Sequence, residues 1–312
     1  AGVLASAPPV QAVTLSELLV DLVQNQKQIK AAESDVEAAE ERAEAAWGNW
    51  YPTFDFTGNW GREKQNKATG TADTEQVPRE VDFKITQQIW DFGSAAAGID
   101  RSRIEVTRAR LNLTSARQAL VLQGIEAYLN IIRAKKVLGF AEGSVANIRR
   151  QAELEDSRVQ RGAGLTTDVL QTKTQLAGAE ARRNNFAGDL RNAINTFRRF
   201  FGKDPGKIED MIQPRGPYEL LPKTLDEVIQ VVHQDNPALR VSKLDADILR
   251  QTIRQTRADE LFPVLNAIAE TKYKRDVGGT LGQSTEQLFK VELTYSLNMG
   301  GTGLHSIRAA SK

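Results

Sequence analysis

Residues with the chemistry for catalysis are sparse in this chain of 312 residues. There is no cysteine, which excludes a disulfide framework, thiol catalysis and a lipidated cysteine anchor. The two histidines, His233 and His305, cannot form a metal site without distant carboxylates. No nucleophile–base pair or phosphate loop is recognisable, and the Asp and Glu residues lie on predicted helix faces where solvation or i,i+4 pairing suffices. We therefore expect no enzyme, no cofactor and no metal.

The overall charge and hydropathy exclude further classes of protein. The 41 basic and 40 acidic residues leave a net charge of +1, so nothing attracts nucleic acid. No run of eighteen apolar residues is present, so the sequence predicts no transmembrane helix. Residues 1–12 (AGVLASAPPVQA) resemble the end of a secretory signal peptide, with a mature chain from about Val13; a disordered leader is the alternative.

Four segments alternate apolar and polar residues with the period of a β-strand: 53–62, 81–91, 264–273 and 288–298. Polar loops separate them at about 62–80 and 274–287. Strands of about ten residues are long enough to cross a bilayer at a tilt, although an ordinary half-buried sheet gives the same alternation. We predict lipid contact for the residues on the apolar faces, which are Phe54, Phe56, Trp60, Val81, Phe83, Ile85, Ile89, Phe289, Val291, Leu293, Tyr295 and Leu297.

Four strands are too few for a barrel, and lipid does not tolerate open sheet edges. Two or more chains must therefore share one barrel. Twelve strands from three chains leave room for a channel, whereas eight would be filled by side chains.

Long helices make up most of the remaining chain. We predict one helical hairpin over residues 93–202, with its tip at 161–168 and a first helix about 100 Å long. That helix carries two neighbouring apolar stripes, which predict a packing partner on each side. Shorter helices are expected over 14–51 and 224–261. Each begins with a capping box, Thr14 to Glu17 and Thr224 to Glu227, and ends before a proline.

The helix–strand–strand order occurs twice, at an offset of 208 to 211 residues, which indicates an internal duplication. The first repeat covers 13–205, an irregular linker covers 206–223, and an incomplete second repeat covers 224–312, with a helix starting after 301. A complete second repeat would need about a hundred more residues, so we expect the chain to be a fragment.

These elements resemble the TolC-like family of outer-membrane efflux and type I secretion channels. The resemblance rests on the two Thr-Leu-x-Glu helix starts, the Tyr51-Pro52 and Phe262-Pro263 junctions and the segment 85–93 (ITQQIWDFG). Its most specific part is 158–162 (RVQRG) followed by 167–170 (TDVL), which is similar to the hairpin tip of the family. Departures are Val159, where the family usually has an aromatic residue, and Asn298-Met299.

The resemblance implies an α+β membrane protein of the cell outer membrane. Three chains form a homotrimer. Each chain contributes four strands to one shared 12-stranded β-barrel, and the helices form a periplasmic tube. The tube docks a periplasmic adaptor (membrane fusion) protein and, through it, an inner-membrane pump or ABC transporter. The implied docking residues are Arg158, Gly162, Gly164, Leu165, Thr166, Thr167 and Asp168.

A purely structural interpretation of the tip needs only glycines for a tight turn and Thr167 or Asp168 as a helix cap. No gate residues are assigned, because the family places them in the second hairpin. The alternative function is a periplasmic coiled-coil adaptor or scaffold protein. It explains the hairpin but not the duplicated amphipathic strands.

Overall fold

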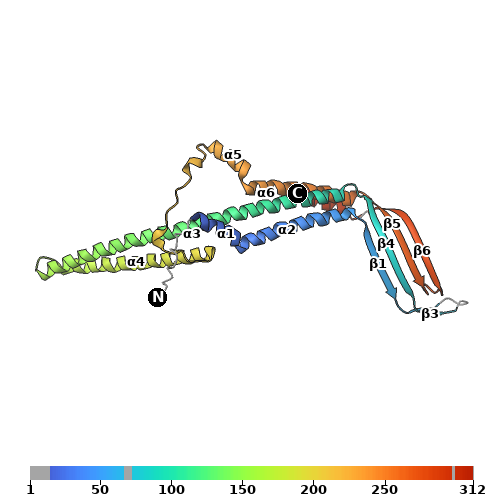
Figure 1. Cartoon of the computed structure of the whole chain (residues 1–312), viewed down its shortest axis with the longest axis horizontal. Coiled ribbons are helices and arrows are strands. Elements are labelled where there is room, and N and C mark those ends of the chain that lie inside the picture. Colours follow the sequence, from blue (N-terminus) through green and yellow to red (C-terminus); the bar gives the residue numbers. More distant parts are fainter. Residues whose placement is uncertain (1–14, 67–71, 297–298, 312) are drawn as a thin grey trace, which may run out of the picture. The chain divides into compact units, whose positions relative to one another are not determined.

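The computed structural model describes residues 15–66, 72–296 and 299–311, which form two compact units (Figure 1). One unit contains the described residues up to Glu33 together with Leu113–Val231, and the other contains Ser34–Asn112 and the described residues from Val232 onward. The units therefore do not coincide with the expected repeats 13–205 and 224–312. The reason is that the long helices contribute one end to each unit, so a repeat boundary in the sequence is not a domain boundary.

Helices and strands follow one another in the order that the sequence predicts, with long helices and a four-stranded sheet, which confirms the α+β fold class. The elements are α1 (Leu15–Asn25), α2 (Lys27–Trp47), the 3-10 turn η1 (Gly48–Trp50), β1 (Thr53–Trp60), β2 (Glu63–Gln65), β3 (Thr74–Gln76), β4 (Arg79–Trp90), α3 (Ser94–Gln160), α4 (Thr166–Phe201), η2 (Ile208–Asp210), η3 (Tyr218–Leu220), α5 (Leu225–Asp235), α6 (Pro237–Leu261), β5 (Val264–Arg275), β6 (Gln283–Thr294) and α7 (Thr302–Ala310).

Both helices expected to be continuous, over 14–51 and 224–261, are broken after about eleven residues. The first breaks at Gln26, whose side-chain amide Nε2 donates to the Phe200 carbonyl at 2.9 Å. The second breaks at Asn236, whose Oδ1 accepts from the backbone N–H of Ala238 at 2.9 Å. Pro237 then occupies the first turn of α6, where its missing N–H costs nothing. Because the two breaks are 210 residues apart, they belong to the duplication.

The capping boxes differ from the expectation in detail. Thr14 lies outside the described residues. Thr224 Oγ1 accepts from the N–H of Glu227 at 3.3 Å, as predicted, but the Glu227 carboxylate accepts from the N–H of Lys223, at 2.8 Å, one residue before the predicted partner. The box is therefore present at α5 with a shifted second bond.

The main sheet has the strand order β1-β4-β5-β6, and all neighbours are antiparallel. β6 begins at Gln283 rather than at 288. This is because the preceding turn is short: the Asp276 carboxylate accepts from the N–H of Gly282 at 2.8 Å, and pairing begins immediately at Arg275 and Gln283. The expected loop 62–80 contains a small separate ribbon of β2 and β3.

In the second unit, the N-terminal part of α3 has two helical neighbours, as its two apolar stripes predict. Arg110 forms an ion pair with Glu40 of α2 at 2.7 Å, and Arg108 forms one with Asp245 of α6 at 3.0 Å. These pairs are largely exposed, so most of the packing energy comes from the apolar stripes.

Asp91 starts α3. Its carboxylate is buried and accepts from the backbone N–H groups of Gly93 at 3.0 Å and Ala95 at 2.5 Å, and from the Gln88 amide at 2.9 Å. The carboxylate thus satisfies helix donors that would otherwise lack partners, at the end where negative charge is favoured.

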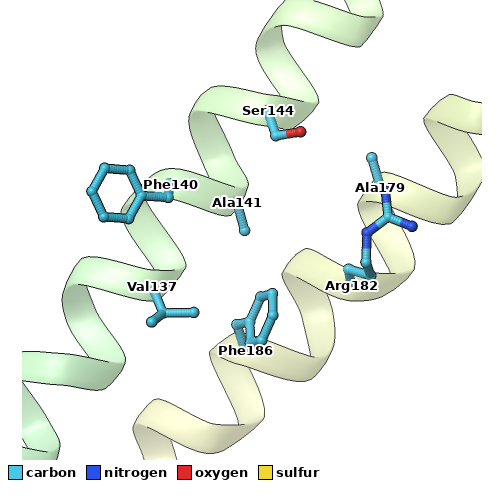
Figure 2. Close-up of a pocket in the computed structure, with 7 residues that line it drawn as sticks. All are labelled: Val137, Phe140, Ala141, Ser144, Ala179, Arg182 and Phe186. Atoms are coloured by element: carbon cyan, nitrogen blue, oxygen red, sulfur yellow. The ribbon is translucent and has the colours of Figure 1, made fainter.

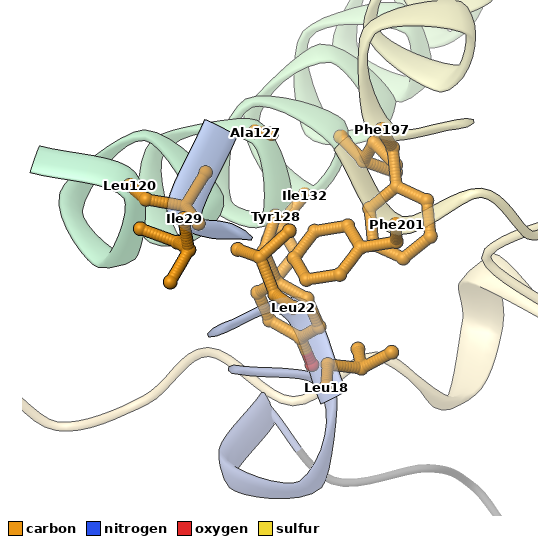
Figure 3. Packing of buried hydrophobic residues seen from close by; sticks show 10 residues of the cluster. Leu18, Leu22, Ile29, Leu120, Ala127, Tyr128, Ile132, Phe197 and Phe201 are labelled. Carbon is orange, nitrogen blue, oxygen red and sulfur yellow. The ribbon is translucent and has the colours of Figure 1, made fainter. Parts of the chain in front are cut away.

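The first unit has a core where α1, the first turn of α2, α3 and α4 meet (Figure 3). Phe197 and Phe201 of α4 contact each other with ring centroids 4.4 Å apart. Tyr128 of α3 donates its hydroxyl to the Ile212 carbonyl at 3.0 Å. The cluster consists of Leu18, Leu22, Ile29, Leu120, Ala127, Tyr128, Ile131, Ile132, Phe197 and Phe201.

Polar contacts at the edge of this core tie α1 to the end of α4. The Asp21 carboxylate accepts from the Lys203 ammonium at 3.0 Å and from the Asn25 amide at 2.6 Å. These two hydrogen bonds, the one from Lys203 first, lower the pKa of Asp21 below its ordinary value.

Gly124 permits the close approach of α1 to α3. A Cβ atom at this position would lie 2.7 Å from Leu22 Cδ2 and 3.0 Å from Leu19 Cδ2, whereas one at Gly139 of the same helix would meet no atom within 4 Å. We expect Gly124→Ala to lower the free energy of unfolding by about 1–3 kcal/mol through overpacking. Gly139→Ala should raise it by about 0.5–1 kcal/mol through helix propensity. Denaturant unfolding followed by circular dichroism measures both, and equal stabilities would contradict the close packing.

Removal of the Asp91 cap should also be measurable. Asp91→Ala leaves buried donors at the start of α3 without partners, so the free energy of unfolding should fall by about 1–2 kcal/mol. Asp100→Ala is the matched control, because Asp100 lies on the same helix and makes only an exposed 3.8 Å ion pair with Arg103. The control should change stability by a few tenths of a kcal/mol. Thermal unfolding of the two variants side by side tests this, and equal losses would argue against the cap.

Candidate functional site

The sheet gathers its large apolar residues on one face. The register places Phe56 opposite Phe83 and Phe54 opposite Ile85. The Phe83 ring lies 5.0 Å from that of Phe56, 6.2 Å from that of Phe54 and 6.4 Å from that of Tyr273 on β5. Aromatic rings at these separations attract one another, so three strands are joined by one aromatic cluster.

This apolar face is open. Phe289 is 90% exposed, Trp60 is 79% exposed, and Phe54 and Phe56 are both 62% exposed. A contiguous apolar surface of this kind marks contact with another molecule or with a membrane, because a water-exposed face costs the hydrophobic free energy of each side chain.

The opposite face carries a ladder of alternating charges. Lys272 of β5 lies 3.0 Å from the Glu270 carboxylate and 3.8 Å from that of Asp82. Lys274 lies 2.7 Å from the Glu286 carboxylate on β6 and 4.0 Å from that of Glu80 on β4. Lys290 and Glu292 form a further close pair along β6. This face is therefore suited to water, and the sheet has one apolar and one charged side.

Most of the residues predicted to contact lipid lie on the apolar face, but the end of β4 and the end of β6 differ from the prediction. Ile89 falls at a β-bulge, where the register with β5 shifts between Gln88 and Trp90, so the strand's alternation does not determine its direction. Tyr295 lies just beyond the end of β6, and Leu297 lies outside the described residues. Val81 is only partly exposed and pairs with Tyr273.

Tyr273 was not predicted for this face. It continues the alternation of Leu265, Ala267 and Ala269 and is 52% exposed. Extending that alternation by two more steps would have found it; the small alanines weaken the signal in this strand.

The hairpin tip joins α3 to α4 through residues 161–165. Gly162 adopts φ +77°, a left-handed conformation that favours glycine. The N–H of Gly162 donates to the Val159 carbonyl and that of Ala163 donates to the Arg158 carbonyl, both at 2.9 Å. A Cβ atom on Gly164 would lie 3.1 Å from the Val159 side chain. The left-handed backbone thus favours glycine at 162, and the close contact with Val159 favours a small residue at 164.

Neither Thr167 nor Asp168 caps α4, contrary to the structural interpretation. The N-cap residue is Leu165, which forms no side-chain capping bond, and Thr166 is the first helical residue. Asp168 sits in the first turn, where its charge favours the helix dipole from an exposed position. Arg158 forms an exposed ion pair with Glu155 at 3.2 Å. All seven predicted tip residues are exposed and lie close together in the chain.

The α3–α4 hairpin also contains a shallow cavity of about 270 Å³ (Figure 2). Phe186 points between the two helices and Phe140 points away from α4. Small residues, Ala141 and Ala179, face each other beside Arg182. The polar side chains that line it are Arg182 and Ser144, and no His, Asp or Glu is among the lining residues to act as a base for the serine, so the cavity does not suggest catalysis.

Among residues 15–66, 72–296 and 299–311, no group of His, Cys, Asp or Glu is arranged to hold a metal ion. Over the same part of the chain, no helix has the length and apolar character needed to cross a membrane.

Comparison with known proteins identifies relatives over most of the chain. The profile of the family described as outer membrane efflux protein matches residues 18–203. Outer membrane protein TolC of Vibrio cholerae is 23% identical over 257 residues, which cover 81% of this chain and 56% of TolC. The alkaline protease secretion protein AprF of Pseudomonas aeruginosa is 25% identical over 303 residues, which cover 93% of this chain and 62% of AprF. The chain thus spans less than two thirds of the length of these relatives.

The fold agrees with these matches. The crystal structure of the outer membrane protein VceC from Vibrio cholerae superposes with a TM-score of 0.76 at 15% identity, covering 95% of this chain and 72% of that one. The protein is located in the outer membrane. Since the family profile covers more than half of the sequence, the chain belongs to the outer membrane efflux protein family.

Proposed function

We propose that the protein is a passive export channel, the outer-membrane exit duct of a tripartite efflux pump or a type I secretion system. The observation that carries this proposal is the two-faced sheet, with aromatic residues exposed on one side and paired charges on the other. A sheet that turns its aromatic side toward lipid and its charged side toward a water-filled lumen places each side in a suitable environment. The duct itself performs no catalysis.

The unpaired edges of the sheet require strands from other copies of the chain. Among the described strands, β1 pairs only with β4 and β6 pairs only with β5. Unpaired backbone groups at these edges are not tolerated in the hydrocarbon region, and four strands cannot close on themselves. A homotrimer with a shared 12-stranded barrel removes the edges and leaves a lumen.

The hairpin tip is proposed to dock a periplasmic adaptor protein, and through it an inner-membrane pump or ABC transporter. Its support is the exposure of two leucines, Leu165 and Leu170, at 67% and 61%, beside the charged Arg158 and Asp168. Exposed apolar residues rimmed by charges are typical of protein-binding surfaces.

The lipid-facing assignment predicts that Phe83→Arg blocks assembly. An arginine near the membrane midplane costs about 2–4 kcal/mol. The outer-membrane fraction, run on gels with and without boiling, should then lose its heat-labile oligomer. Asn266→Arg is the matched control, since it adds the same charge on the charged face of the internal strand β5, opposite Glu292. Normal oligomer yield from Phe83→Arg would refute the assignment of this face to lipid.

The docking assignment predicts that Asp168→Arg abolishes export without affecting assembly. Loss of the favourable helix-dipole interaction costs only about 0.3–1 kcal/mol, too little to unfold the hairpin. Asp189→Arg makes the same change of charge at an exposed position of the same helix and should export normally. Each variant is expressed in cells that lack their own channel, and export is measured as the efflux of a fluorescent dye. Unchanged export by Asp168→Arg would remove Asp168 from the contact.

A further inference from the structure

The proposed barrel requires one contact that a single chain lacks, the seam between β6 of one chain and β1 of the next. In the described sheet β1 has β4 on one side, β6 has β5 on one side, and their other edges are open. The register of this seam is a question that rests on the proposed function. The internal duplication supplies the answer.

The two hairpins of the sheet have the same register. The β1–β4 ladder begins with Thr53 opposite Thr86, and the β5–β6 ladder begins with Val264 opposite Thr294. Val264 follows Thr53 by 211 residues, and Thr294 follows Thr86 by 208. Pro52 and Pro263 differ by the same 211, and Gly93 and Gly301 by the same 208. β5 is therefore the counterpart of β1, and β6 is the counterpart of β4.

The β4–β5 ladder then serves as the chain's own example of the seam, since it joins the second strand of one repeat to the first strand of the next. In it, Lys84 lies opposite Glu270 and Thr86 lies opposite Ile268. Applying the two offsets to these pairs places Glu292 opposite Asn59 and Thr294 opposite Thr57.

We propose that β6 of one chain pairs antiparallel with β1 of a second copy in the register that sets Thr294 opposite Thr57, with residues 291–293 opposite residues 58–60. Val291 then lies beside Trp60 and Leu293 beside Gly58 on the apolar face, while Glu292 lies beside Asn59 on the charged face. A slip by one residue would mix the two faces, so only shifts by two preserve the pattern.

The residues at the two edges fit this arrangement. Trp60, Val291 and Leu293 are 79%, 69% and 64% exposed in the single chain, and pairing would cover part of each. No two charges of like sign face each other across the four pairs, and Thr opposite Thr is a favourable cross-strand pair.

Disulfide trapping in the outer membrane tests the register, because these 312 residues contain no cysteine that would compete with the introduced pairs. Directly opposite residues on antiparallel strands have Cα atoms about 4.5–5.5 Å apart, within the range that a disulfide spans. In full-length protein carrying both Thr57→Cys and Thr294→Cys, mild oxidation should link most chains into dimers and trimers on a non-reducing gel. Reductant should return them to monomers. Gly58→Cys with Leu293→Cys, the neighbouring pair in the same register, should behave alike.

Two shifted pairs and one internal pair complete the design. Thr57→Cys with Glu292→Cys, and Asn59→Cys with Thr294→Cys, are out of the proposed register by two residues in opposite directions. They should link chains at least several-fold less. Thr53→Cys with Thr86→Cys lie opposite each other within one chain and should close without forming an oligomer, which shows that the sheet is folded and the oxidant reaches it.

The outcomes separate the register from the proposed function. Stronger linking by either shifted pair would overturn this register while supporting a barrel shared between chains. Closure of the internal pair with no linking between chains by any other pair would overturn both the seam and the shared barrel.

Discussion

The antiparallel pairing of β4 with β5 is the contact on which the second unit depends. It joins strands from the two repeats, which are far apart in the sequence, and it fixes where the neighbouring helices begin and end. β4 leads into α3 through the Asp91 cap, and α6 leads into β5 through Phe262. The rings of Phe92 and Phe262 stack there, 4.9 Å apart and inclined by 16°. With both junctions held together, the start of α3 lies beside the end of α6, and the Arg108–Asp245 ion pair joins the two helices further along.

Much of this architecture could be predicted because it depends on patterns that repeat over many residues. Alternation over 53–62 and 288–298 predicts which face of each strand is apolar, and the two apolar stripes of α3 predict that it has two neighbours. The duplication was visible as offsets between Pro52 and Pro263, and the structure adds a shared hairpin register to it. Each such pattern sums many weak preferences, so single deviations do not hide it.

The features that the sequence did not reveal depend on single contacts. The break at Gln26 has no proline or glycine to mark it, and what fixes it is a bond to Phe200, a residue distant in the chain. The break at Asn236 does have a signal, because Asn followed by Pro favours a helix start, but the prediction of one continuous helix passed over it. β6 begins early because of one carboxylate in the turn at Asp276. At the tip, glycines locate the turn, but an exposed helix start can satisfy its N–H groups with water. The presence of Thr167 and Asp168 therefore did not determine the cap.

The free-energy costs of the two possible orientations can be compared for the sheet of the proposed barrel. Its charged face carries Lys84, Lys272, Lys274 and Lys290, in the strands that also provide most of the carboxylate partners. Turning this face toward lipid would cost about 2–4 kcal/mol for a lysine near the midplane and about 0–1 kcal/mol for one near the interfaces. Lys84 pairs with Glu270 and Lys290 with Ile268, both central in β5, so these two alone would cost roughly 4–8 kcal/mol per chain. It would also leave Phe54, Phe56 and Phe289 in water, at a loss of about 1.5–3 kcal/mol for each large side chain. The sum is comparable to the whole stability of an ordinary domain, about 5–15 kcal/mol. In the proposed barrel this pattern therefore favours one orientation, with the aromatic face toward lipid and the lysines toward water.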